Sequence, residues 1–363
     1  MAAADRVERT ARQAARSRFD AVIVTPSADM LWLTGYDPMP LPRLTCLVIR
    51  PGRPTALVVP KLEQPLAEAA GIGEIAEIVA WGDTDDPHRI VSRIVGKGQR
   101  VACSDRMWAS HLLQLQRVLP KARFFSASKV LAPLRSIKDQ EELTHLRRAA
   151  RYADESFGRI LRARLESATE REVAGTLEGL LLEMGNDRVA FTIVGSGPNA
   201  ASPHHEPGDR QLQAGDALVM DFGGTTAGYN SDITRTVSVT APTAELQEVY
   251  GIVREAQDRA FSTVAPGVPA QEVDRAAREV IESAGYGDRF IHRTGHGIGL
   301  EVHEDPYLVE GNDQALEVGM CFSIEPGIYL PGRLGVRIED IVTVTQDGAA
   351  RLNHASRDLE VVA

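Results

Sequence analysis

The first 130 residues alternate short apolar runs with helical patterns. Apolar runs occur at 21–26, 44–49 and 55–60, and residues 111–119 have helical spacing. Strands that alternate with helices indicate an α/β layer arrangement. This part of the sequence has no phosphate-binding glycine loop and no cluster of potential metal ligands. We therefore interpret it as a scaffold or substrate-covering domain.

The pattern changes near residue 130. Pro133 interrupts the chain, and a long helical pattern begins after Asp139, which stands where a helix N-cap would. Short strands and Gly/Pro turns dominate residues 186–345. Further helices are expected near 169–184, 243–262 and 269–284. These patterns predict an α/β domain over 1–130 and an α+β domain over 131–363.

Two aspartates lie at the ends of apolar runs in the segment 217–239. The first run ends at Asp221, glycine-rich residues turn the chain, and the next β-prone run holds Asp232. If the turn centres on 226–227, the two residues are opposite each other across a hairpin, about 4.5–5.5 Å apart at Cβ. Two carboxylates that close raise each other's pKa unless a cation lies between them. Alternatively, both are ordinary turn residues, which are common beside Gly and Asn.

The segment 320–344 repeats this arrangement with two glutamates. An apolar run ends at Glu325, a Pro-Gly pair turns the chain, and a second strand holds Glu339. Alternation with a period of two places Arg337 and Glu339 on one face of that strand. A carboxylate in a central strand is unfavourable without a partner. A structural ion pair with Arg337 would supply one, but it would leave Glu325 unexplained.

Three histidines, His292, His296 and His303, lie within twelve positions and are interleaved with three glycines. The glycines disfavour a helical zinc motif, and the glutamate of such a motif is missing. A phosphate loop is excluded as well, because no Lys or Ser/Thr follows the glycines. The remaining interpretation is a turn whose small residues let His296 approach a site closely.

Composition and charge narrow the class of protein. A chain of 363 residues is long enough for two domains, and 43% hydrophobic with 25% charged residues is typical of globular proteins. The net charge of −10 argues against a nucleic-acid partner. No apolar run reaches the ~18–20 residues of a membrane span, so no membrane association is expected. Three scattered cysteines favour a reducing compartment, and we expect a cytoplasmic protein.

Together, the C-terminal part offers four carboxylates and the glycine-framed His296, and a further loop holds His204 and His205. This oxygen-rich set suits two Mn²⁺, Co²⁺ or Fe²⁺ ions, and could also accept Zn²⁺, better than it suits one tetrahedral Zn²⁺. Two bridged ions can activate water and polarise a carbonyl. The chemistry therefore predicts hydrolysis.

These residues, in this order, resemble the pita-bread metallopeptidases, the family of Xaa-Pro dipeptidase (prolidase), aminopeptidase P and methionine aminopeptidase. The motifs DFGG…SDITRT, GHGIGLEVHEDP and EPGIY…VRIED match the family patterns, and the match covers about residues 130–363. The N-terminal part is similar to the creatinase-type domain of prolidases and aminopeptidase P. The resemblance implies an α/β creatinase-like domain followed by an α+β pita-bread catalytic domain.

The resemblance also implies roles for individual residues. The metal ligands would be Asp221, Asp232, His296, Glu325 and Glu339. Asp232 and Glu339 would bridge both ions, and Glu325 would also act as general base on the bridging water.

The same resemblance implies residues that act on the substrate. His204 and His303 match two accessory histidines that contact the substrate and stabilise the tetrahedral intermediate. His204 is preferred over His205 because it directly follows a proline. Arg337 matches an arginine that orients the bridging carboxylate or the substrate. His292 matches no family role, and we expect it to serve packing or a turn.

The function that the resemblance implies is metal-dependent hydrolysis of the Xaa-Pro bond in dipeptides, with two divalent ions, Mn²⁺ first. The expected partners are a proline-containing dipeptide or short peptide and a second copy in a homodimer. Three alternatives remain. They are an Xaa-Pro aminopeptidase (aminopeptidase P) that acts on longer peptides, a creatinase-like or ectoine-type hydrolase on the same scaffold, and a metal-free binding module, which would require lost ligands.

Overall fold

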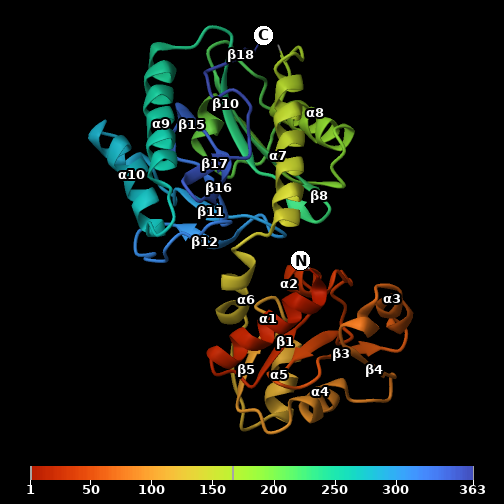
Figure 1. Cartoon of the computed structure of the whole chain (residues 1–363). Coiled ribbons are helices and arrows are strands. Elements are labelled where there is room, and N and C mark those ends of the chain that lie inside the picture. Colours follow the sequence, from red (N-terminus) through yellow and green to blue (C-terminus); the bar gives the residue numbers. More distant parts are fainter. Residues whose placement is uncertain (1, 166, 363) are drawn as a thin grey trace. The chain divides into compact units, whose positions relative to one another are not determined.

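The computed structural model describes residues 2–165 and 167–362. The chain divides into two compact units, Met1–Arg135 and Ser136–Ala363 (Figure 1). Within the described residues, no helix combines the length and the apolar character that crossing a membrane would require.

The first unit is built on a six-stranded mixed sheet with the order β4-β3-β2-β1-β5-β6. Its strands are β1 (Ala21–Val24), β2 (Cys46–Ile49), β3 (Ala56–Pro60), β4 (Glu77–Trp81), β5 (Arg100–Cys103) and β6 (Arg123–Ser126). Its helices are α1 (Ala3–Arg16), α2 (Ala28–Thr34), α3 (Gln64–Ala69), α4 (Pro87–Val95), α5 (Ala109–Val118) and α6 (Ser128–Arg135). The apolar runs of the sequence form β1, β2 and β3, and the expected α/β arrangement is confirmed.

The second unit contains two larger sheets and a two-stranded ribbon. One sheet has the order β18-β10-β8-β7, and the other has the order β12-β11-β13-β16-β17. The strands are β7 (Arg188–Ser196), β8 (Ala217–Thr226), β9 (Tyr229–Asn230), β10 (Ile233–Val239), β11 (Gly295–Gly297), β12 (Glu304–Leu308), β13 (Cys321–Ile324), β14 (Gly327–Leu330), β15 (Leu334–Arg337), β16 (Asp340–Thr345), β17 (Gly348–Arg351) and β18 (Val361–Val362). The ribbon pairs β14 with β15.

Four long helices cover these sheets in pairs. They are α7 (Gln140–Ile160), α8 (Glu170–Glu183), α9 (Ala244–Thr263) and α10 (Ala270–Ser283). The predicted N-cap is confirmed, since the Asp139 side chain accepts from the backbone of Glu141 and Glu142 and completes a capping box at the start of α7. The helices expected near 169–184, 243–262 and 269–284 form α8, α9 and α10.

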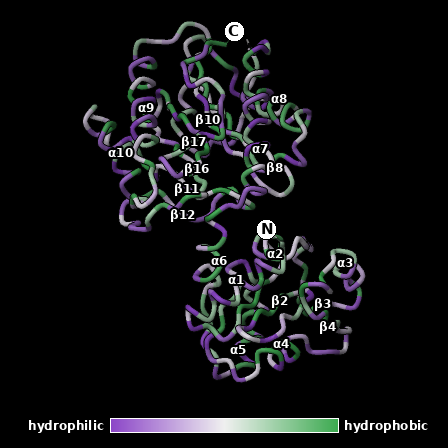
Figure 2. Tube along the Cα trace, viewed as in Figure 1, coloured by the Kyte–Doolittle hydropathy of each residue, from purple (hydrophilic) through white to green (hydrophobic). Residues whose placement is uncertain are grey.

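Each helix pair buries its apolar face against a different sheet. Phe157 and Leu177 of α7 and α8 pack with Met220 of β8, whereas Val253 of α9 packs in the cluster that includes Phe322 of β13. Figure 2 shows that strands of both units are mainly hydrophobic, while the long helices also carry hydrophilic residues. Asp221 lies within β8 and His296 within β11, whereas the other unusual polar residues flank strand ends: Asp232 precedes β10, Glu325 follows β13 and Glu339 precedes β16.

Candidate metal centre

The first acidic pair lies on the hairpin formed by β8 and β10. Ala227 (φ 50°) and Gly228 (φ 82°) form its turn, one position later than a turn centred on 226–227. Asp221 therefore pairs with Thr234 rather than with Asp232, so the expectation that the two aspartates are directly opposite is wrong. The register differs by two residues, which keeps both aspartates on the same face because side chains alternate with a period of two.

The second acidic pair lies where two pairs of strands meet. Ile324 of β13 pairs with Asp340 of β16, and Gly327 of β14 pairs with Arg337 of β15. Both pairs have the same register, so Glu325 lies opposite Glu339. The predicted Pro-Gly turn is wrong, because Gly327 remains paired and the chain reverses at 331–333. Glu339 consequently lies between β15 and β16, not inside one continuous strand.

His296 lies in the short strand β11, which packs closely against its neighbours. A Cβ atom at Gly295 would lie 1.9 Å from the carbonyl oxygen of Ser323, and one at Gly297 would lie 2.2 Å from that of Asp305. At Gly299 it would lie 2.7 Å from a carboxylate oxygen of Glu304. Glycine is required here because the backbones approach so closely. The expectation that small residues let His296 approach a site agrees with this packing.

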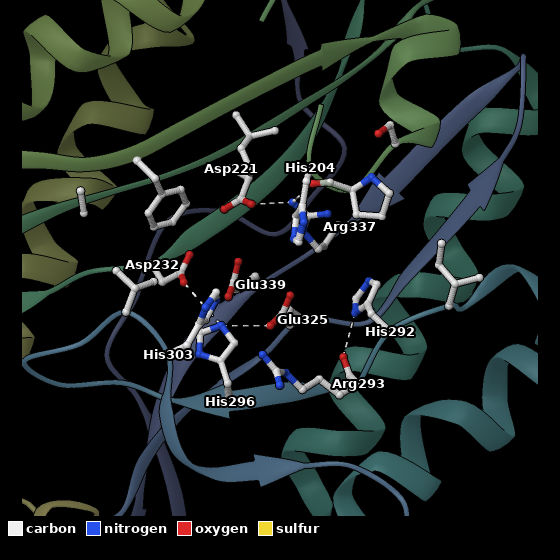
Figure 3. Close-up of a pocket in the computed structure, with 17 residues that line it drawn as sticks. His204, Asp221, Asp232, His292, Arg293, His296, His303, Glu325, Arg337 and Glu339 are labelled. Carbon is white, nitrogen blue, oxygen red and sulfur yellow. Dashed lines mark hydrogen bonds and ion pairs between the residues drawn. The ribbon is translucent and has the colours of Figure 1, made fainter. Parts of the chain in front are cut away.

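All eight residues selected from the sequence line one pocket of about 880 Å³ (Figure 3). They are His204, Asp221, Asp232, His296, His303, Glu325, Arg337 and Glu339. His292 and Arg293 line it as well. His205 points elsewhere, because its Nε2 atom lies 2.8 Å from the fully buried carboxylate of Glu170.

Asp232, His296 and Glu339 form the centre of the cluster, with one ligand atom of each within 4.8 Å of the others. The Nε2 atom of His296 lies 3.2 Å from Glu325 Oε1 and 3.7 Å from Asp232 Oδ2. The Nδ1 atom lies 3.1 Å from the carbonyl oxygen of Gly297. A proton on Nδ1 would be donated to that carbonyl, so Nε2, which faces the carboxylates, either carries a second proton and donates to Glu325 or coordinates a metal ion.

Asp221 supplies a direct test of whether these residues fit a metal ion. Its Oδ2 atom accepts a hydrogen bond of 2.6 Å from Arg337, but its Oδ1 atom is buried and has no hydrogen-bond partner in the described part of the chain. An unsatisfied buried carboxylate oxygen is unfavourable. Together with three more carboxylates and one imidazole, it matches the oxygen-rich coordination of divalent cations.

The shifted pKa values of the carboxyl groups also favour a bound cation. Burial and then the charge of Glu339 raise the pKa of Asp232 well above its usual range. Burial and then the charge of Glu325 do the same to the pKa of Glu339. Burial alone would raise the pKa of Glu325, but the hydrogen bond and charge of His296 outweigh it and lower this pKa to about 2. A cation among these groups would relieve the repulsion.

A layer of hydrogen bonds behind the cluster was not apparent from the sequence. Thr234 Oγ1 donates to Glu339 Oε2 at 2.6 Å and accepts from Arg337 Nε at 3.0 Å. Arg337 Nη1 donates to the Tyr329 hydroxyl at 2.7 Å, and that hydroxyl lies 2.9 Å from His292 Nε2. His292 is therefore part of a hydrogen-bonded chain that ends at the pocket. Thr234 lies two strand positions beyond Asp232 on the same face, but a threonine in a strand is common and gave no signal of its own.

Comparisons with known proteins agree with this arrangement. The model of Metallopeptidase family M24 matches residues 144–346, and that of the Creatinase/Prolidase N-terminal domain matches residues 6–137. The probable dipeptidase PepE of Mycobacterium tuberculosis is 43% identical over 344 residues, which are 94% of this chain and 92% of that protein.

Two solved structures extend the similarity to the fold. Dipeptidase PepE from Mycobacterium ulcerans superposes with a TM-score of 0.96 at 40% identity, covering 99% of this chain and 98% of its own. A recombinant prolidase from Thermococcus sibiricus superposes with a TM-score of 0.93 at 38% identity over 100% of both chains. The chain therefore belongs to metallopeptidase family M24, with a creatinase-type N-terminal domain and a pita-bread catalytic domain.

Proposed function

We propose that this peptidase is a metal-dependent dipeptidase that hydrolyses the Xaa-Pro bond. The observation that carries the proposal is the convergence of four carboxylates and His296 in one pocket, where Asp221 keeps an unsatisfied buried oxygen. The relatives named dipeptidase and prolidase support the choice of substrate.

We assign the metal ligands as the resemblance implies. They are Asp221, Asp232, His296, Glu325 and Glu339, with Asp232 and Glu339 shared between two ions. When bound, such ions lower the pKa of a water molecule and polarise a carbonyl, which is the chemistry that peptide hydrolysis needs. Mn²⁺ is the proposed metal because carboxylate oxygens dominate the set.

The remaining polar residues would act on the substrate. Glu325 would serve as general base, and Ser323 holds it by donating to its Oε1 atom at 3.0 Å. Burial and the neighbouring charge of His296 lower the pKa of His303 to about 4, so a neutral imidazole would meet the scissile carbonyl. His204 would contact the substrate from another side of the pocket, and Arg337 would keep Asp221 oriented.

Apolar side chains give the pocket a surface for a proline ring. Phe191, Ile193 and Val302 line it beside the polar cluster. The three cysteines are buried free thiols, which supports a cytoplasmic location. A homodimer is proposed from the family resemblance alone.

A peptide panel across metals tests the proposal. Purified protein is stripped of metal, reloaded with Mn²⁺, Co²⁺, Fe²⁺ or Zn²⁺, and assayed on Xaa-Pro dipeptides, Xaa-Pro tripeptides and a creatinase-type amide substrate. Hydrolysis of dipeptides in preference to tripeptides is expected, with Mn²⁺ most active. Preference for tripeptides would identify an aminopeptidase instead, and activity that survives metal removal would contradict the metal centre.

A variant of a proposed bridging group gives a second test. Asp232→Asn removes one shared carboxylate and should abolish turnover while the circular dichroism spectrum stays that of the wild type. Near-normal turnover in this variant would contradict the dinuclear assignment.

A further inference from the structure

Two neighbouring histidines in the loop 202–208 have different surroundings. His204 lines the pocket, where Figure 3 labels it, and it is exposed. His205 is half-buried, and its Nε2 atom lies 2.8 Å from Glu170 Oε2. An ionised carboxylate only accepts hydrogen bonds, so this Nε2 atom carries a proton and donates. Because an exposed ring has few packing contacts of its own, the position of His204 depends on how the backbone beside it is held.

Glu170 anchors the chain on both sides of His204. It is fully buried at the start of α8, and its carboxylate accepts from the backbone N–H and the hydroxyl of Ser196 at 2.8 and 2.7 Å. The side chain of Asn199 and the backbone N–H of Gly208 also donate to it, at 3.0 and 3.2 Å.

These contacts keep the Glu170 carboxylate charged. Burial alone would raise the pKa of Glu170, but the hydrogen bonds from Ser196, His205 and Asn199 outweigh it and lower this pKa. The carboxylate is therefore ionised at neutral pH, and each hydrogen bond to it is charge-assisted and correspondingly strong.

The residue on the other side of His204 contacts the metal cluster. The carbonyl oxygen of Pro203 lies 3.5 Å from Arg337 Nη2, and Arg337 is buried within the cluster. His204 thus lies between Pro203, which contacts the site, and His205, which is held by the buried Glu170. A side chain whose backbone is fixed on both sides loses less conformational entropy when it meets a ligand.

We propose that His205 is a positioning residue, whose hydrogen bond to Glu170 holds the loop so that His204 contacts the substrate. The inference rests on the proposed dipeptidase function and extends it to a residue that does not touch the substrate. Loss of the His205 ring would leave Glu170 with its bonds to Ser196, Asn199 and Gly208. We therefore expect the fold to remain and the backbone next to His204 to become loose.

Steady-state kinetics of the Mn²⁺-loaded enzyme on Ala-Pro test the proposal. His205→Ala should lower kcat roughly 3- to 30-fold and change KM less than about two-fold, because His204 is assigned to the transition state rather than to initial binding. His205→Gln should recover most of kcat, since its side-chain amide places an N–H donor near the position of the imidazole Nε2.

A double-mutant cycle separates positioning from a general structural loss. His204→Ala removes the ring that His205 is proposed to position. Adding His205→Ala to that variant should therefore change kcat less than about two-fold, because the second change then has nothing to act through. Effects that multiply, or wild-type kcat in His205→Ala alone, would overturn the inference.

A matched control lies next to the anchor. Arg171 follows Glu170 in α8 and pairs with Asp209 at 2.9 Å, but both side chains are exposed. Arg171→Ala should leave kcat within about two-fold of the wild type, because exposed ion pairs contribute little. Calorimetric titration should give wild-type Mn²⁺ affinity in His205→Ala, and a clear loss of affinity would assign His205 to the metal centre instead.

Failure of the proposed function gives a different result from failure of the inference. If His204→Ala lowers kcat and His205→Ala does not, only the positioning role fails. If the wild type hydrolyses Ala-Ala but not Ala-Pro, the proposed Xaa-Pro specificity fails, and the same cycle is measured on Ala-Ala. Hydrogen exchange needs no substrate: the amides of 204–208 should exchange faster in His205→Ala but not in Arg171→Ala, and unchanged exchange in His205→Ala would refute the proposal.

Discussion

The residues of the site are arranged around an excess of negative charge. Asp221, Asp232, Glu325 and Glu339 would carry four negative charges if all were ionised, and the buried Arg337 offsets one of them. Uncompensated buried charge is strongly unfavourable, so the metal-free cluster retains protons. The raised pKa values of Asp232 and Glu339 express this retention.

The proton retention predicts how metal stabilisation depends on pH. A carboxyl whose folded pKa is raised binds its proton more tightly than in the unfolded chain, so its contribution to stability falls as pH rises above its unfolded pKa of about 4. A metal ion that displaces these protons removes the penalty. The increase in Tm on adding Mn²⁺ should therefore be larger at about pH 7.5 than at about pH 5.5.

Thermal unfolding with and without Mn²⁺ at the two pH values measures this effect. Glu325, with a pKa of about 2, stays ionised throughout and does not contribute to the difference. Asp232→Asn should weaken the dependence on pH, because one of the three carboxyls with a raised pKa, Asp221, Asp232 and Glu339, is gone. An equal increase in Tm at both pH values would be inconsistent with proton retention by the cluster.

Thr234 supports two site residues at once, and its removal should weaken metal binding. Thr234→Val keeps the shape of the side chain but removes the hydroxyl that donates to Glu339 and accepts from Arg337. We expect Mn²⁺ affinity to fall by roughly 10- to 100-fold, as is typical when the partner of a ligand is lost. Calorimetric titration of the metal-free protein measures the change.

A matched control is Thr34→Val in the first unit. The Thr34 hydroxyl is also buried, donates to the Met30 carbonyl and accepts from the Tyr36 backbone. Both variants should lose about 1–3 kcal/mol in the free energy of unfolding, because each removes a buried hydroxyl with two hydrogen bonds. Thr34→Val should nevertheless keep wild-type affinity for Mn²⁺. Unchanged affinity in Thr234→Val would show that Glu339 needs no support from the hydroxyl.

The site residues differ in how clearly the sequence marks them as functional. Carboxylates such as Asp232 and Glu339 stand out because they adjoin or interrupt apolar runs of the sequence, where a charge needs a partner. Thr234 and Tyr329 do not, because both residue types are common in strands for packing reasons alone. Only the three-dimensional contacts distinguish a supporting hydroxyl from an ordinary one.

Among the elements, strands were easier to predict than the turns between them. As alternation predicts, Arg337 and Glu339 share one face, which is that of the pocket, while Val336 and Ile338 lie in the apolar core. The position of a turn depends on one or two residues and on pairing with distant strands. Gly327 illustrates this, because it reads as a turn residue yet remains paired with Arg337.

The close packing of β11 predicts a position-specific effect of adding a methyl group. Gly295→Ala would place Cβ 1.9 Å from the Ser323 carbonyl oxygen, so neighbouring backbone must move. We expect a loss of roughly 1–3 kcal/mol or more in the free energy of unfolding. Gly175→Ala, on the exposed side of α8 with no atom within 4 Å, should instead gain roughly 0.5–1 kcal/mol.

Chemical denaturation of both variants measures the pair. Gly295→Ala should also lose Mn²⁺ affinity, since His296 is the next residue in the strand, whereas Gly175→Ala should not. A stable Gly295→Ala protein with normal metal binding would mean that β11 can shift away from β13 without disturbing the site.

At the scale of the whole molecule, the second unit contains two similar halves that the sequence did not reveal. Each half begins with a helix pair and continues into antiparallel strands. In each, an acid on the second helix is fully buried and accepts from the backbone and hydroxyl of a residue near a strand end: Glu170 from Ser196, and Asp274 from Thr294. The halves preserve this arrangement with different residue types, so no periodic sequence signal remains.

The two units also have separate cores, which predicts that they respond separately to metal. Leu115 belongs to a buried cluster of the first unit, and Leu177 to one of the second. Every proposed ligand lies in the second unit. Mn²⁺ at about 100 times its dissociation constant stabilises the unit that binds it by about 2.7 kcal/mol, which corresponds to roughly 5–10 °C. Scanning calorimetry should therefore show two transitions, of which Mn²⁺ raises only one.

Core variants assign the transitions. Leu115→Ala should lower the temperature of the transition that Mn²⁺ leaves unchanged, and Leu177→Ala should lower the temperature of the one that Mn²⁺ raises. Each variant should lose about 2–5 kcal/mol in the free energy of unfolding of its unit, because a cavity replaces a fully buried side chain. A single transition that both variants lower and Mn²⁺ raises as a whole would mean that the units unfold together. In that case the creatinase-type domain would share the stabilisation that metal binding confers on the catalytic domain.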